Sequence, residues 1–206
     1  MTERHARVVI LAGPSGAGTS RLATRLQHAH GWPIVRLDDF YRDEDDPQMP
    51  RSEELGIIDW DHPDSWNREA ALDALGLLVT EGRVETPVYD IGANRAVDRA
   101  VVTARPSDII LAEGIFAAEI IADLHELGLL AGAFCVHHQR WVTFARRLAR
   151  DLNERRKPPL TLVRRGLALA REEPSVIRRQ QALGAKPARA SDLEGHLSAL
   201  AALAAT

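Results

Sequence analysis

Gly13-Pro14-Ser15-Gly16-Ala17-Gly18-Thr19-Ser20 is the most informative stretch of the sequence. It joins a continuous apolar run, residues 7–12, to an amphipathic segment, residues 19–30, so the predicted order is strand, glycine-rich loop and helix. Glycines let the backbone N–H groups of such a loop turn inward around phosphates, and the N-terminus of the following helix adds partial positive charge. Residues 13–20, called the phosphate loop below, are therefore predicted to bind phosphate groups, with the Ser20 hydroxyl placed to ligate Mg²⁺.

One position departs from the usual form of this loop. The motif reads G-x-x-x-x-G-K-[ST], and Thr19 stands where the lysine that meets the β- and γ-phosphates is expected. Losing a preorganised charge of this kind costs about 10²–10³ in rate if nothing replaces it. Three explanations stay open: another cation replaces the lysine, the protein binds a nucleotide without efficient catalysis, or the sequence is that of an altered, inactive enzyme.

The composition limits the class of protein. A chain of 206 residues that is 45% hydrophobic and 27% charged predicts one globular domain, residues 1–206, rather than a disordered chain. No apolar run approaches the roughly 18 residues that a membrane helix needs, and no signal peptide is visible. The single cysteine, Cys135, cannot form an intrachain disulfide, so we expect a reducing, cytoplasmic setting.

Charge is separated along the chain. Residues 38–90 hold 16 acidic and four basic side chains, whereas residues 139–189 hold 14 basic and four acidic ones. This separation indicates a cation site facing an anion site. Lysine occurs only at Lys157 and Lys186, and genomic base composition is an alternative explanation for the excess of arginine. A nucleic-acid surface is disfavoured, because the net charge is −3 and the basic segment has few aromatic residues.

Short apolar runs alternate with helical patterns along the chain. Strands are expected at residues 33–37, 108–112 and 131–136, helices at 68–80 and from about 141 to 155, and a hairpin from 84–89 and 96–103. Continuous apolar strands separated by helices indicate a mainly parallel sheet that is covered on both faces. The predicted fold class is therefore α/β with three layers.

Five further motifs resemble those of the uridine kinase / phosphoribulokinase family of P-loop kinases, in the same order. Asp38-Asp39-Phe40-Tyr41 resembles D-x-F-Y, Asp61-His62-Pro63-Asp64 resembles F-D-H-P-D, Pro87-Val88-Tyr89-Asp90-Ile91 resembles P-x-Y-D-F, Glu113-Gly114-Ile115 resembles E-G-I/L, and residues 146–157 resemble the lid R-R-x-x-R-D-x-x-E-R-G-R. The resemblance spans residues 7–184 and implies a P-loop NTPase fold with a mainly parallel five-stranded sheet. It also implies a β-hairpin substrate flap at about 84–103 and a helical lid at about 146–160. Phosphoribulokinases often carry G-A-G-T-[ST], which gives Thr19 a precedent in an active kinase.

The resemblance implies a role for each of these positions. It implies ATP and Mg²⁺ as cofactors, and transfer of the γ-phosphoryl group to a small acceptor, foremost the 5′-hydroxyl of uridine or cytidine. Asp38 is implied as the general base, with Ser20 and Glu113 serving Mg²⁺. The acceptor is expected to meet Tyr41, Trp60, Asp61, Tyr89 and Asn94. The lid is expected to bring Arg146, Arg147 and Arg150 to the transferring group, and Arg155 and Lys157 to the nucleotide.

Several alternatives stay open. Ile91 replaces an aromatic residue and Asn94 replaces a base-reading histidine, so the acceptor could be another small hydroxyl compound, such as a sugar phosphate or a pantothenate-like acid. A nucleotide-binding protein with little catalysis is the alternative that Thr19 supports. Arg156 replaces the lid glycine, and Lys157 or a lid arginine is our hypothesis for the substitute of the loop lysine. Neither a nucleic acid nor a membrane is an expected partner, and a homo-oligomer, which is common in the family, stays open.

Each motif also has a plain structural explanation. The Asp38-Asp39 pair is a frequent turn signal, and His62-Pro63-Asp64 suits a rigid turn before a helix. A carboxylate at a strand end, such as Glu113, and a basic solvated helix at the lid need no ligand. The order and number of the motifs favour the kinase interpretation.

Overall fold

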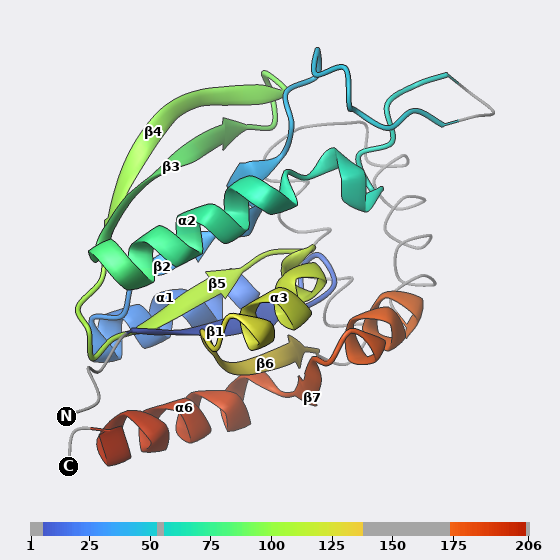
Figure 1. Ribbon diagram of the computed structural model, residues 1–206. Coiled ribbons are helices and arrows are strands. Elements are labelled where there is room, and N and C mark those ends of the chain that lie inside the picture. Colours follow the sequence, from blue (N-terminus) through green and yellow to red (C-terminus); the bar gives the residue numbers. More distant parts are fainter. Residues whose placement is uncertain (1–5, 53–55, 138–173, 205–206) are drawn as a thin grey trace.

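The structure is a computed structural model that describes residues 6–52, 56–137 and 174–204 (Figure 1). Its main sheet has five parallel strands in the order β2-β5-β1-β6-β7, and β3 and β4 form a separate antiparallel hairpin. The strands are β1 Arg7–Ala12, β2 Ile34–Arg36, β3 Arg83–Asp90, β4 Arg95–Thr103, β5 Ile109–Glu113, β6 Leu130–Val136 and β7 Lys186–Ala188. The expected α/β fold with a five-stranded parallel sheet and a β-hairpin is confirmed.

The helices begin and end at local signals that the sequence carries. The α-helices are α1 Thr19–His30, α2 Arg68–Glu81, α3 Ile121–Glu126 and α6 Ala190–Ala204, and short 3₁₀ helices lie at η1 Leu37–Phe40, η2 Pro63–Ser65 and η3 Ala117–Ile120. Residues 174–182 are also helical. Gly31 and Gly82 end α1 and α2 in the left-handed conformation, with φ of 74° and 69°. The Asn67 side chain caps α2 by accepting a hydrogen bond from the Ala70 N–H at 3.1 Å.

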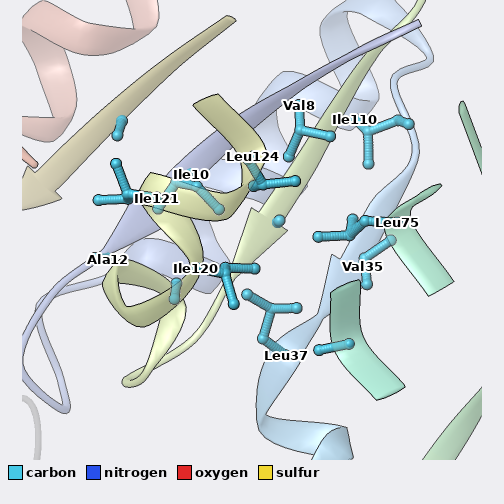
Figure 2. Packing of buried hydrophobic residues seen from close by; sticks show 14 of the residues in the cluster. Val8, Ile10, Ala12, Val35, Leu37, Leu75, Ile110, Ile120, Ile121 and Leu124 are labelled. Atoms are coloured by element: carbon cyan, nitrogen blue, oxygen red, sulfur yellow. The ribbon is translucent and has the colours of Figure 1, made fainter. Parts of the chain in front are cut away.

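The sheet is buried on both faces, as its continuous apolar strands predicted. Val8, Ile10 and Ala12 of β1 pack in a cluster with residues of α2, η3 and α3, which Figure 2 shows in part. Val9 and Leu11, which alternate with them, pack against residues of α1 and α6 on the opposite face. Because the phosphate loop continues directly from β1, this two-sided packing fixes the position of the residue where the loop begins, Gly13.

Most elements match their expected positions, and the differences have local causes. Strand β2 ends at Arg36 rather than 37, because the chain turns into η1. β7 was not expected, since its three residues carry Pro187 and pair only at the sheet edge. α6 was not expected either, because its alanine-rich sequence has a weak amphipathic pattern. The helix expected from about 141 to 155 and the lid at 146–160 lie outside the described residues.

The carboxyl ends of β1, β5 and β2 lie next to each other in the sheet. β1 leads into the phosphate loop, β5 leads into the segment that begins at Gly114, and β2 leads into η1. Ligands of open α/β sheets bind outside such strand ends, so this edge is where a site is expected. No described helix is both long and apolar enough to cross a membrane.

Candidate active site

The phosphate loop forms a tight turn at the end of β1. Gly16 and Gly18 have φ angles of 84° and 91°, a region that favours glycine. Gly13 is equally constrained, because a Cβ there would lie 2.6 Å from the carbonyl oxygen of Val136 in β6. The turn therefore delivers the chain to the N-terminus of α1, whose unpaired amides can meet an anion.

Three side chains meet where α1 begins and β5 ends. Oε2 of Glu113 accepts hydrogen bonds from the hydroxyls of Thr19 at 3.1 Å and Ser20 at 2.9 Å. The Glu113 side chain is only 5% exposed, and this burial raises the pKa of its carboxyl, while the two hydroxyls oppose the rise. The structure thus brings together both predicted Mg²⁺ positions and the residue that replaces the loop lysine.

This oxygen-rich cluster has the donor chemistry of a hard cation site. Mg²⁺ is usually bound by one or two carboxylates together with waters and substrate phosphates, rather than by a cage of protein ligands. The Ser20 hydroxyl and the Glu113 carboxylate fit that pattern. Across residues 6–52, 56–137 and 174–204, no three His, Cys, Asp or Glu side chains are grouped to hold a metal by themselves.

Asp38 lies in η1, directly after β2, and its carboxylate is held from the end of β5. Its Oδ1 accepts a hydrogen bond from the Ile115 N–H at 2.9 Å. Gly114 makes room for this approach, because a Cβ there would lie 2.6 Å from the same oxygen. The side chain reaches solvent, yet the protein around its carboxylate displaces enough water to raise the pKa to about 6. The nearby Glu113 charge adds to this rise, and the Ile115 amide opposes it.

An aromatic cluster surrounds Tyr41, beyond Asp38. The Tyr41 ring centroid lies 6.1 Å from that of Trp60, 5.8 Å from Tyr89 and 5.9 Å from Phe116. These rings come from the segment after η1, the segment before η2, the hairpin and the segment after β5. The structure therefore gathers three of the predicted acceptor residues in one place.

Tyr89 connects the β3–β4 hairpin to η1 and to the segment that follows η1. Its backbone N–H donates to Oδ1 of Asp39 at 3.3 Å, and its hydroxyl donates to the carbonyl oxygen of Arg42 at 3.2 Å. Desolvation and two nearby carboxylates raise the pKa of Tyr89 to about 12, so the phenol stays protonated. The Tyr89 hydroxyl is thus already used in a hydrogen bond within the protein.

Asn94 lies at the hairpin tip in the left-handed conformation, with φ of 52°. Its side-chain Nδ2 donates to Oε2 of Glu44 at 2.9 Å, and its backbone carbonyl oxygen accepts from the Glu44 backbone N–H at 3.0 Å. The neighbouring Ile91, which replaces an aromatic residue of the motif, is 66% exposed. The Asn94 side chain, which was expected to contact the acceptor, is therefore hydrogen-bonded to Glu44 in the segment after η1.

The remaining predicted residues divide into two groups. Asp61 is exposed and lies close enough to Tyr41 for its charge to contribute to a raised phenol pKa. The predicted lid residues lie outside the described residues: Arg146, Arg147, Arg150, Arg155 and Lys157.

The sequence interpretation missed two side chains that support the site. Phe116 is buried beneath Tyr41, and its place directly after Glu113-Gly114-Ile115 was an available signal. Gln180 is 3% exposed and has no local signal, since it sits in a basic helical segment. Its Nε2 donates to the Ile115 carbonyl oxygen at 3.2 Å, and its Oε1 accepts from the Cys135 thiol at 3.2 Å.

Comparison with known proteins gives a family match over most of the chain. Residues 8–158 match the phosphoribulokinase / uridine kinase family. A uridine kinase of Clostridium botulinum (strain Kyoto / Type A2) is 29% identical over 164 residues, covering 78% of this chain and 76% of that protein. A uridine kinase of Bacillus mycoides (strain KBAB4) is 30% identical over 149 residues, covering 72% and 68%.

A solved structure shares the fold. The putative fructose transport system kinase from Silicibacter sp. TM1040 aligns with a TM-score of 0.63 at 20% identity, over 90% of each chain. At this identity the likeness concerns the fold alone. The family match covers most of the chain and includes the phosphate loop, η1 and the end of β5. The chain therefore belongs to the phosphoribulokinase / uridine kinase family of P-loop kinases.

Proposed function

We propose that this protein transfers the γ-phosphoryl group of ATP to a hydroxyl of a small, uncharged acceptor. The 5′-hydroxyls of uridine and cytidine are the leading acceptors. The observation that carries the proposal is the position of Asp38. Its charge acts on Tyr41 of the aromatic cluster, and its carboxylate is held at the end of β5, where Glu113 accepts hydrogen bonds from the start of α1.

Asp38 has the properties that a general base for a hydroxyl needs. A pKa of about 6 leaves the carboxylate charged at neutral pH, and makes it a stronger proton acceptor than an ordinary aspartate. The Ile115 N–H fixes one oxygen, so the other can face an acceptor hydroxyl. As that hydroxyl attacks, Asp38 accepts its proton, while the phosphate loop holds the phosphates in line.

Mg²⁺ is the cation proposed for the cluster at the start of α1. Ser20 and Glu113 would hold it, as their oxygen donors fit a hard cation. When bound, it neutralises charge on the phosphate oxygens. The hydrogen bonds from Thr19 and Ser20 keep the Glu113 carboxylate turned toward the phosphate loop.

The charge of the acceptor side supports a neutral acceptor over an anionic one. Like Asp38, three further carboxylates lie close to Tyr41 or Tyr89 of the aromatic cluster, those of Asp39, Asp43 and Asp61. The guanidinium of Arg42, whose carbonyl oxygen accepts the Tyr89 hydroxyl, is already paired with the Asp46 carboxylate at 3.2 Å. A sugar phosphate or a carboxylic acid would meet repulsion there, whereas hydroxyl donors would find acceptors.

Uridine and cytidine lead because the curated relatives are uridine kinases and because aromatic rings are available for a base. One observation favours a second candidate, a neutral sugar or polyol. One of the two N–H donors of the Asn94 amide is used by Glu44, so the amide has only one donor left for a pyrimidine edge. An acceptor without a base would not need this group.

The test is ADP formation with Mg²⁺-ATP and a panel of acceptors: uridine, cytidine, neutral sugars, a sugar phosphate and pantothenate. ADP formation that requires uridine, cytidine or a neutral sugar supports the proposal. Asp38→Asn should lower kcat by about 10²–10⁴ while leaving ATP affinity unchanged. Asp45→Asn, an exposed neighbour in the acidic segment, is the matched control and should act like the wild type.

Two outcomes would contradict the proposal. If only the anionic acceptors are phosphorylated, the charge argument is wrong. If ATP binds but no acceptor stimulates ADP formation, the protein is a nucleotide-binding member of the family with little catalysis, as the Thr19 substitution allows.

A further inference from the structure

The N-terminus of α1 lacks the positive side chain that the phosphate-loop motif places there. The Thr19 hydroxyl donates to Glu113 at 3.1 Å, so it faces a carboxylate rather than replacing a cation. Glu113, Asp38 and Asp39 place three carboxylates at the end of the sheet where phosphates are expected. Beyond the Mg²⁺ proposed above, a transferring phosphoryl group would therefore need a positive side chain from another part of the chain.

The last residue of β2, Arg36, has the right place in the sheet. In the register of β2 and β5, Arg36 lies opposite Glu113. Side chains alternate along a strand, and Figure 2 shows Val35 and Leu37 in the cluster formed with α2 and α3. Arg36 therefore projects from the other face, which is the face that α1 covers and on which Ile34 packs.

The guanidinium of Arg36 is available for a ligand. The side chain is exposed, and within the described part of the chain no hydrogen bond or ion pair holds it. Its charge nevertheless acts on the site, because it lowers the pKa values of Asp38, Asp39 and Glu113. Arg36 thus lies near Asp38, the predicted base, and near Glu113, whose carboxylate is hydrogen-bonded to the start of α1.

We propose that Arg36 binds the γ-phosphate of ATP and supplies the positive charge that a lysine at position 19 would provide. The inference rests on the proposed kinase function. The γ-phosphate is the expected ligand because Arg36 stands two residues before Asp38, at the acceptor end of the nucleotide. A guanidinium fork binds two phosphate oxygens at once, and its charge opposes the charge that develops during transfer.

The first experiment measures nucleotide binding without an acceptor. Arg36→Gln keeps a polar side chain but removes the charge, and its binding of Mg²⁺-ATP and Mg²⁺-ADP is measured by titration calorimetry. We expect ATP affinity to fall by about 10- to 100-fold, the usual worth of a hydrogen bond between charged groups, with ADP affinity within about twofold of the wild type. Arg83→Gln, at an exposed position that starts β3, is the matched control and should change neither affinity.

The second experiment is a rescue. If Arg36 supplies the missing charge, Thr19→Lys in the Arg36→Gln background should restore most of the lost ATP affinity. Arg36→Lys, which keeps the charge without the fork, should lie between the wild type and Arg36→Gln, and it serves as the test if the glutamine variant unfolds. With a productive acceptor, kcat should follow the same order, with Arg36→Gln slower by about 10²–10³.

Clear results would overturn the proposal. Arg36→Gln with wild-type affinity for ATP, or with equal losses for ATP and ADP, means that Arg36 does not bind the γ-phosphate. A selective loss of ATP affinity in Lys157→Ala but not in Arg36→Gln would assign the charge to the lid instead. Because these readouts need no acceptor, they remain valid if the acceptor proposal fails, and a wild-type protein that binds no ATP would refute the proposed function itself.

Discussion

Replacing Gly114 with alanine should slow the reaction much more than it weakens the fold. The added Cβ would lie 2.6 Å from Asp38 Oδ1, 3.0 Å from Leu37 Cβ and 3.2 Å from the Asp38 amide nitrogen. Ordinary van der Waals contact begins near 3.4 Å, so the carboxylate oxygen must retreat by about 0.8 Å.

That retreat removes the hydrogen bond that orients the proposed base. Oδ1 of Asp38 lies 2.9 Å from the Ile115 nitrogen, so a retreat of about 0.8 Å away from that nitrogen takes the pair past the roughly 3.2 Å limit of such a bond. A misplacement of about 1 Å costs about 10² in rate, whereas overpacking costs about 1–3 kcal/mol of unfolding free energy. The Ile115 N–H also lowers the Asp38 pKa, so its loss should move the acid limb of the pH–rate profile upward from about pH 6.

The assay is a continuous measurement of ADP release across pH, together with ATP affinity and urea unfolding of the same preparations. Gly76→Ala is the matched control, because Gly76 lies inside α2 and nothing stands within 4 Å of an added Cβ. It should raise stability by about 0.5–1 kcal/mol and leave kcat unchanged. A Gly114→Ala enzyme with the kcat and acid limb of the wild type would refute the placement of Asp38 as the base.

Three further predictions concern the wild-type site and its support. In the wild type, kcat/KM should fall about tenfold per pH unit below about pH 6 as Asp38 is protonated, and a flat pH–rate profile would exclude this base. Gln180→Leu leaves the Ile115 carbonyl and the Cys135 thiol without their partner, so urea unfolding should show a loss of about 1–3 kcal/mol. Gln181→Leu, at an exposed neighbour, should stay within about 0.5 kcal/mol of the wild type. Burial raises the pKa of Cys135 to about 11, so iodoacetamide near neutral pH should label it only after unfolding, and rapid labelling of the folded protein would contradict that burial.

Local signals in the sequence were sufficient for the parts of the fold that carry strong periodicity. The run 7–12, the phosphate loop and α1 were expected at the positions where they occur, because a buried parallel strand and an amphipathic helix leave distinct patterns. α6 was not predicted because its alanine-rich sequence has a weak amphipathic pattern, although Leu193 and Leu197 are buried. β7 was not predicted because an edge strand of three residues is too short to show an alternating pattern of apolar and polar residues.

In the candidate site, too, local motifs predicted some features, and contacts between distant segments were not visible in the sequence. Short motifs predicted roles for Asp38, Glu113 and Tyr89, and each of these residues lies at or just after a strand end or in the hairpin. The use of the Asn94 amide by Glu44 was not visible in the sequence, because it joins residues 50 positions apart. The link from Gln180 to Ile115, across 65 positions, was equally hidden.

The sequence alone determined the class of this protein, because the phosphate loop with its glycines and the order of the motifs are local properties of the chain. Only the tertiary structure decided what those residues do to one another. Parallel pairing of β2 with β5 sets Arg36 beside Glu113, and the missing side chain of Gly114 lets Asp38 reach the Ile115 amide. The pKa of Asp38, the orientation of Glu113 and the proposed role of Arg36 all depend on distances between segments that no local pattern encodes.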